Sequence, residues 1–333
     1  MRSRIDVKKI LYALPHSRTL RELARNAGVS HTAVRRLLKE LSTQGVFRVI
    51  TDDSFWGLTR VIVLDQEGRV PRHVPPGTTG LRTLISEQGS GTLIMSYIPK
   101  RLVDKYMETL REEVDVSEWF TSKEYIAWLP NPELEAVTPK DFEKLVDRSA
   151  EYVPPRTRAR PLSMPDEYDL ILLWGKLLYG PFTRPSDIFS KIRGIKLPSK
   201  QVLSYHYRAH FQPGWRYTTF FKFASSDDIP FIMYYLKGSD AERVARALAL
   251  LPLLGMSLIG EKQALYMGQP LCGYHPLFLE IPQTYNVEAP YGIFYMKLDL
   301  YTDVPRLWEM LDRDKKEWKW PEHKIPIKLQ EKT

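Results

Sequence analysis

Apolar residues at helical spacing begin close to the N-terminus and predict three short helices. The first stripe stops at Pro15, and its members are Val7, Ile10, Leu11 and Leu14. Thr19 and Ser30 are suited to cap a second and a third helix, and Gly28 separates these two helices. Three short helices with a glycine turn before the third are typical of a helix-turn-helix.

Two strand-like segments follow the third helix and predict a wing. Residues 46–50 and 58–64 are rich in β-branched and aromatic side chains, and Asp52 and Asp53 provide the turn between them. A hairpin at this position would complete a winged helix-turn-helix in residues 1–66.

Charge distribution separates this first unit from the rest of the chain. Residues 1–50 hold eleven Lys and Arg against three acidic residues, whereas the remaining 37 basic and 37 acidic residues cancel. A clustered cationic excess is typical of a protein that binds a polyanion, although a merely solvated basic face is the alternative. A helical projection at about 100° per residue places Arg36 and Lys39 opposite the apolar stripe of Val34, Leu37, Leu38 and Leu41. The residues expected to contact double-stranded DNA are Ser30, His31, Thr32, Arg35, Arg36, Lys39, Thr43 and Arg48.

The helix-turn-helix resembles that of a known family. Residues 23–37 resemble the DNA-binding segment of the bacterial and archaeal Lrp/AsnC (feast/famine) transcriptional regulators. Their sequence is Leu-Ala-Arg-Asn-Ala-Gly-Val-Ser-His-Thr-Ala-Val-Arg-Arg-Leu. Residues 55–64 are similar to the strand by which that family enters its βαββαβ sensing domain, and 91–97, 102–114 and 125–129 resemble the remainder of that domain. The resemblance implies a sequence-specific regulator with a small-molecule effector, such as an amino acid, and assembly through its sheets within one chain or in a homodimer.

The same order of elements recurs after a linker rich in proline and arginine. Apolar helices are predicted over 170–178 and 186–192, Ser199 can cap a third, and a strand follows over 215–223. An internal duplication explains this order. The predicted fold class is therefore α+β, with two winged helix-turn-helix units that are each followed by a ferredoxin-like, βαβ-rich unit of Lrp type. The expected units are 1–66 (first winged helix), 67–135 (sensing or assembly), 136–165 (connecting helix and linker), 166–224 (second winged helix) and 225–333 (second α/β unit and tail).

The third helix of the second unit carries less charge than its counterpart. Its inward stripe, judged by spacing, is Val202, Tyr205, His206 and Ala209. The projected outer face is Lys200, Ser204, Tyr207 and Phe211, and aromatic residues at such positions more often pack than stack on bases. A second set of expected DNA contacts is Ser199, Lys200, Ser204 and Arg208, with a protein–protein role as the alternative.

Catalytic and metal-binding side chains form no recognised motif in the sequence. His206 and His210 have the i, i+4 spacing of metal ligands, but the sequence indicates no third ligand, so we expect no metal site. Cys272 lies near His275 without a residue that would orient the imidazole, and a lone cysteine is usually a small buried apolar residue. We expect no catalytic residue, no cofactor and no enzymatic activity.

Two alternatives to a regulator stay open. Siroheme decarboxylases resemble the Lrp/AsnC proteins in combining a winged helix with a βαββαβ unit, and this resemblance implies pocket histidine, tyrosine and arginine residues. The nearest candidates are His73, Tyr97, His275 and Arg306. A protein-interaction or chromatin-architectural protein is the second alternative. The concentration of positive charge on the first unit favours the regulator over the decarboxylase, which needs no basic recognition helix.

Hydropathy and cysteine content predict a cytoplasmic protein without a membrane partner. The longest apolar stretch, 247–259, contains Pro252 and Gly255 and is shorter than the ~18–20 residues that span a bilayer. The first residues lack the apolar segment of a signal peptide, and a single cysteine cannot form an internal disulfide.

Overall fold

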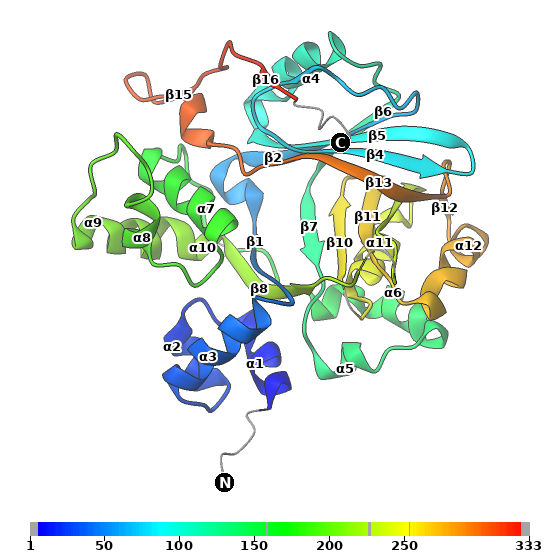
Figure 1. Cartoon of the computed structure of the whole chain (residues 1–333), viewed down its shortest axis with the longest axis horizontal. Helices are drawn as coiled ribbons and strands as arrows, with labels where there is room; N and C mark the ends of the chain where they lie inside the picture. The colour runs from blue at the N-terminus through cyan, green and yellow to red at the C-terminus, as the bar shows by residue number, and fades with distance from the viewer. Residues whose placement is uncertain (1–5, 158, 226–227, 253, 328–333) are drawn as a thin grey trace, which may run out of the picture.

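The computed structural model describes residues 6–157, 159–225, 228–252 and 254–327, and its fold is α+β, as the sequence predicts. Two groups of short helices lie beside a body built around one large sheet (Figure 1). Within the described residues, no helix is both long enough and apolar enough to cross a bilayer.

The first helical group is formed as the apolar spacing predicts. Its helices are α1 (Val7–Ala13), α2 (Leu20–Asn26) and α3 (His31–Leu41). The Thr19 and Ser30 hydroxyls accept hydrogen bonds from the backbone N–H groups of Glu22 and Ala33, so they cap α2 and α3. Gly28 has a φ of +66°, a left-handed conformation that glycine adopts without strain and that lets the chain turn between the two helices.

The predicted wing hairpin is wrong. Strand β1 (Gly45–Thr51) does not pair with β2 (Leu58–Asp65); it pairs antiparallel with β8 (Trp215–Lys222), which follows the second helical group. A 3₁₀ turn at Asp53–Trp56 buries Phe55 and Trp56 and redirects the chain, so β2 enters the large sheet instead. The two helical groups are therefore joined through one two-stranded ribbon (Figure 1).

The large sheet is antiparallel and combines strands from both α/β segments. Its strand order is β6 (Glu118–Ser122), β2, β5 (Gly89–Pro99), β4 (Thr78–Ser86), β13 (Ile293–Thr302), β9 (Ile232–Gly238), β11 (Gln263–Gln269), β10 (Leu254–Ile259) and β7 (Glu124–Ala127). A short strand, β12 (Val287–Glu288), also pairs with β9. Because β13 lies between β4 and β9, strands from 67–135 and from 225–333 share one sheet.

The two ends of this sheet meet. The terminal strands of the order, β6 and β7, are consecutive in the chain and separated only by Lys123. The Lys123 backbone N–H donates to the Ile259 carbonyl at 2.8 Å, and the Ser122 hydroxyl contacts the same carbonyl at 3.3 Å. The sheet thus curves around an apolar interior that includes Ile62, Leu64, Leu93, Met233, Tyr235 and Leu265.

Helices cover the outside of the sheet in two separate cores. Alternate residues of β2 and β5 pack outward against α4 (Val103–Arg111) and α7 (Glu167–Tyr179). Alternate residues of β9 and β11 pack outward against α6 (Phe142–Tyr152), α11 (Ala241–Leu250) and α12 (His275–Thr284). Both faces of these strands are buried, which explains why their sequences read as continuous apolar runs. Further short elements are α5 (Pro132–Glu135) and two strand pairs: β3 (His73–Val74) with β16 (Ile325–Pro326), and β14 (Leu311–Asp312) with β15 (Glu317–Trp318).

The second helical group differs from the sequence-based projection. It consists of α7, α8 (Pro185–Phe189), α9 (Lys200–Tyr205), a π-helical turn over His206–Phe211 and α10 (Gln212–Gly214). Of the four residues projected inward, His206 is buried, but Val202, Tyr205 and Ala209 are exposed. Leu203 and Phe211 are buried instead. The inward stripe begins one residue later than predicted, and the π-helical turn changes the rotation between residues after His206.

Candidate functional site

The third helix of the first group presents the side chains that the sequence assigns to DNA. His31, Thr32, Arg35, Arg36, Lys39 and Thr43 are exposed, and Ser30 caps the helix. Arg36 Nε lies 3.9 Å from Glu40 Oε1 with both side chains 61% exposed, so this ion pair does little to occupy the guanidinium. The outer face of α3 is therefore cationic and accessible.

Arg48 lies elsewhere. It is half-buried on β1 and donates from Nη1 to the Leu177 carbonyl of α7 at 2.8 Å. This bond directs its side chain toward the second helical group and away from the outer face of α3. In the second group, Ser199 caps α9, Lys200 and Arg208 are exposed, and Ser204 is half-buried. Tyr207 stacks on Phe211 at 5.6 Å, which agrees with a packing role for both rings.

A cleft lies between α7, the large sheet and residues 301–310. It consists of two neighbouring cavities of about 480 and 160 Å³ that share Asp303, Val304 and Pro305. The larger cavity is within the usual volume of ligand pockets. The basic and aromatic residues that line the larger cavity are Trp174, Tyr179, Lys191, Tyr301, Arg306 and His323. Those that line the smaller cavity are Arg48, Arg60, Tyr97 and Tyr125.

Arg60 is the most constrained cation of this cleft. Its Nε donates to Asp53 Oδ2 at 2.8 Å, and its guanidinium carbon lies 4.6 and 4.4 Å from the ring centroids of Tyr97 and Tyr125. Burial lowers the pKa of Arg60, but the Asp53 carboxylate and the two tyrosines more than offset this, so the pKa is raised and the side chain stays charged. Of the three guanidinium nitrogens of Arg60, only Nε has a hydrogen-bond partner among the described residues.

Tyr97 is held as a neutral phenol beside this cation. Its hydroxyl donates to Asp53 Oδ1 at 2.9 Å, and Thr51 donates to the same oxygen at 2.7 Å. Burial, and then the negative charge of Asp53, raise the pKa of Tyr97 well above its usual value. Burial also raises the pKa of Tyr125. The smaller cavity therefore combines a permanent cation with phenols that stay protonated at neutral pH.

The sequence identified this cleft only in part. Tyr97 and Arg306 line it, as the decarboxylase resemblance implied. His73, on β3, does not line the cleft, and its Nδ1 lies 3.6 Å from Glu113 Oε1. His275 begins α12, which packs in the other core, and its Nε2 is buried without a hydrogen-bond partner among the described residues. Arg60 and Trp174 were missed, because nothing in an apolar strand or helix marks one side chain as facing a cavity.

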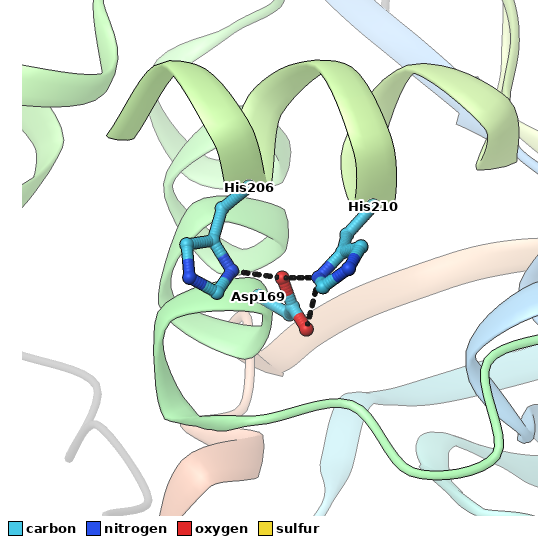
Figure 2. A group of neighbouring side chains, drawn as sticks. All are labelled: Asp169, His206 and His210. Atoms are coloured by element: carbon cyan, nitrogen blue, oxygen red, sulfur yellow. Dashed lines mark hydrogen bonds and ion pairs between the residues drawn. The ribbon is translucent and has the colours of Figure 1, made fainter. Parts of the chain in front are cut away.

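A second cluster of polar side chains joins α7 to the π-helical turn. Figure 2 shows the imidazoles of His206 and His210 converging on the carboxylate of Asp169. His206 Nδ1 lies 2.7 Å from Asp169 Oδ1, and His210 Nδ1 lies 2.9 and 3.0 Å from the two carboxylate oxygens. Asp169 stands 37 residues before His206, so no local spacing could indicate it as the third polar group.

Asp166 borders the same cluster and a further cavity. Its Oδ1 accepts from the Asp169 backbone N–H and lies 3.6 Å from His206 Nδ1. Burial, followed by the Asp169 carboxylate, raises the pKa of Asp166. The adjacent cavity of about 470 Å³ is also lined by Glu167, Tyr168 and Arg313.

Comparison with known proteins gives structural matches only. No family model and no curated protein matches the chain. Among solved structures, that of the siroheme decarboxylase NirDL matches with a TM-score of 0.47 and 10% identity, covering 90% of this chain and 93% of that chain. NirDL in complex with an iron-uroporphyrin III analogue matches with a TM-score of 0.41 and 12% identity, covering 91% and 93%. Both matched structures are of an enzyme, a finding that contradicts the expectation of no enzymatic activity.

Proposed function

We propose that the chain is a siroheme-decarboxylase-like enzyme that binds a polycarboxylate tetrapyrrole in the cleft beside α7. The observation that carries this proposal is the lining of the cleft, where cations surround a partly aromatic pocket. Arginine and lysine side chains recognise carboxylates through charge-assisted hydrogen bonds, and aromatic rings pack against a planar macrocycle. The rims of the two cavities provide both kinds of group at once.

Charge balance in the cleft fits an anionic ligand. Arg48, Arg60, Lys191 and Arg306 line it together with only two acidic residues, Asp303 and Glu309. Glu309 lies 3.5 Å from Arg306 with both side chains substantially exposed, so a ligand carboxylate can displace it at small cost. Asp53 already pairs with Arg60, so these four cations and three carboxylates leave one net positive charge for the ligand to neutralise.

The chemistry of decarboxylation assigns a role to the smaller cavity. When a carboxylate leaves as CO₂, the electron pair of the broken C–C bond stays on carbon, which must then take a proton. Tyr97 is a neutral phenol that can supply this proton once its hydroxyl turns away from Asp53; Arg60 beside it offsets part of the charge of the phenolate, which then regains a proton from water. Arg48 and Arg306 would hold the carboxylates that are retained.

An anaerobic titration of the full chain with siroheme tests the proposal. Binding is followed by the absorption of the tetrapyrrole, and loss of CO₂ by mass spectrometry of the extracted product. Each charge-assisted hydrogen bond is worth about 1.5–3 kcal/mol, so Arg48→Ala and Arg306→Ala should each weaken binding at least about tenfold. Arg101→Ala, at an exposed arginine outside the cleft, is the control. Unchanged absorption with the unmodified chain would contradict the proposal.

A second candidate function is duplex DNA binding through α3. The observation that favours it is the accessible cationic face formed by Arg35, Arg36 and Lys39. This face lies on a different helix from those that line the cleft, so both functions can coexist in one chain. If both helical groups contact DNA, they would bind two half-sites of different sequence, because their exposed side chains differ. Helix α3 would then make the main DNA contact.

The amino-acid effector and the homodimer stay predictions. A thermal-shift screen of the amino acids against the full chain tests the first, and light scattering coupled to size exclusion tests the second. If no amino acid changes the melting temperature of the full chain, an amino-acid effector is excluded, and the α/β segments would serve assembly or catalysis only.

A further inference from the structure

We propose that Asp169, His206 and His210 bind a divalent transition-metal ion of the zinc class. The three side chains each offer one donor atom, and these atoms lie within 4.8 Å of one another. Two imidazole nitrogens and one carboxylate oxygen are a ligand set that zinc and its neighbours in the first transition row accept. Figure 2 shows both Nδ1 atoms directed at the carboxylate from one side of the π-helical turn.

The distances between the ligands suit a tetrahedral ion. Zn–N and Zn–O bonds of about 2.0–2.2 Å place neighbouring ligand atoms about 3.3 Å apart in a tetrahedron. The present N···O distances of 2.7 to 3.0 Å need to open by a few tenths of an ångström, and any pair of donor atoms near the 4.8 Å limit of the cluster must close toward that distance. In the tautomer that carries hydrogen on Nδ1, each imidazole can donate to the carboxylate, and a bound ion would replace these hydrogens.

Burial distinguishes this cluster from an ordinary surface group. The side chains of Asp169, His206 and His210 are 2%, 9% and 21% exposed. A carboxylate so deeply buried requires a compensating positive charge, and a dication provides it while both imidazoles stay neutral. The rotamers are already fixed, so little side-chain entropy is lost when the ion binds.

Neighbouring groups hold each ligand in place. The Asp166 backbone N–H donates to Asp169 Oδ2 at 3.1 Å, which leaves Oδ1 for the ion. The Tyr205 ring packs edge-on against His206 and His210 at 5.4 and 5.0 Å, and Tyr168 packs against His206 at 5.4 Å. The hydrogen bond orients the carboxylate, and the ring contacts restrict the orientation of the two imidazoles.

Asp166, which lines the neighbouring cavity, is the nearest group that could supply a fourth ligand. Asp166 Oδ1 lies 3.6 Å from His206 Nδ1, and this side chain is 55% exposed. It can therefore rotate to complete the tetrahedron or leave the position to water. Two carboxylates and two neutral imidazoles together neutralise the charge of a divalent cation. The two nitrogen ligands disfavour Mg²⁺ and Ca²⁺, because these ions prefer oxygen ligands.

Calorimetric titration of the chelator-treated full chain with Zn²⁺ tests the site. We expect one equivalent to bind, and Co²⁺ in its place to give the visible ligand-field absorption of a tetrahedral site. His210→Ala, the more exposed ligand, should weaken Zn²⁺ binding at least tenfold and abolish the Co²⁺ absorption. His73→Ala and Cys272→Ser are matched controls at exposed positions outside the cluster and should leave both signals unchanged.

Two results would overturn the proposal. One is the absence of stoichiometric Zn²⁺ binding by the folded, unmodified chain. The other is equal affinity in the unmodified chain and in His210→Ala. If that variant does not fold, the unmodified chain still decides the question, because Zn²⁺ but not Mg²⁺ should raise its melting temperature, and a chelator should reverse the rise. Identical melting temperatures with the two ions would refute the site.

Discussion

The guanidinium carbon of Arg60 lies 4.6 Å from the ring centroid of Tyr97, and both side chains bind the same carboxylate, Asp53. Asp53 follows the ribbon strand β1, whereas Arg60 and Tyr97 lie on neighbouring strands β2 and β5 of the large sheet. The carboxylate therefore connects the ribbon between the helical groups to the wall of the cleft. Packing of a cation on a ring adds attraction when both are shielded from water.

Arg60→Gln should destabilise the chain by about 3 kcal/mol, because it leaves the largely buried Asp53 carboxylate without its cation. Urea unfolding measures the loss. Asp53→Asn combined with Arg60→Gln should cost less than the two single changes added together. Lys105→Ala, which breaks the exposed Lys105–Glu108 pair, is the control and should cost less than about 1 kcal/mol. Equal losses for the buried and the exposed pair would contradict this prediction.

Phe220→Ala should loosen the first helical group from the rest of the chain. The Phe220 ring lies 4.8 Å from Phe47 across the β1–β8 ribbon and is buried in the core of α1–α3. Removal of such a ring costs about 3–5 kcal/mol. Limited proteolysis should cut the variant faster between the helices and β1. Phe223→Ala, at an exposed ring just after β8, should leave the cleavage rate unchanged, and a similar rate for both variants would count against the ribbon as the main attachment.

Lys176 should make stability depend on pH. Burial lowers the pKa of its ammonium to about 7, whereas the unfolded chain keeps an ordinary value. Between pH 7 and about 10 the unfolded chain then binds more protons, so the free energy of unfolding rises with pH by up to about 1.4 kcal/mol per unit. Urea unfolding at pH 7, 8 and 9 measures this slope.

Lys176→Met should reduce that slope, because the variant has no group that loses a proton on folding at this position. Lys222→Met, at an exposed lysine on β8, is the control and should keep the full slope. Parallel slopes for Lys176→Met and the unmodified chain would mean that the Pro181 and Thr183 carbonyls, each 2.7 Å from Nζ, keep the ammonium charged in the folded chain.

Arg36→Ala should weaken duplex binding by the full chain without unfolding it. If Arg36 contacts a guanine edge, the loss should be about 1–3 kcal/mol and depend on sequence; if it contacts phosphate, all duplexes should weaken alike and the salt slope should fall by about one. Fluorescence anisotropy at several salt concentrations separates the two. Lys200→Ala should cost less, since Tyr207 and Phe211 on the same helical segment are packed. A larger effect of Lys200→Ala would assign the main DNA contact to the second helical group.

Local signals in the sequence were sufficient for the first helical group. The apolar stripe of α3, the Ser30 cap and Gly28 act over three to five residues, so their structural consequences do not depend on the rest of the chain. The α+β class and the alternation of strands with helices were predictable for the same reason.

Contacts between distant segments were decided only by the tertiary structure. A strand carries no mark of its partner, so the pairing of β1 with β8 in place of β2 depends on how the 3₁₀ turn at Asp53–Trp56 redirects the chain. The meeting of Asp169 with His206 and His210 likewise depends on how α7 packs against the π-helical turn. Sequence spacing predicts side chains on one face of one element, whereas a pocket requires several elements to be placed against each other in space.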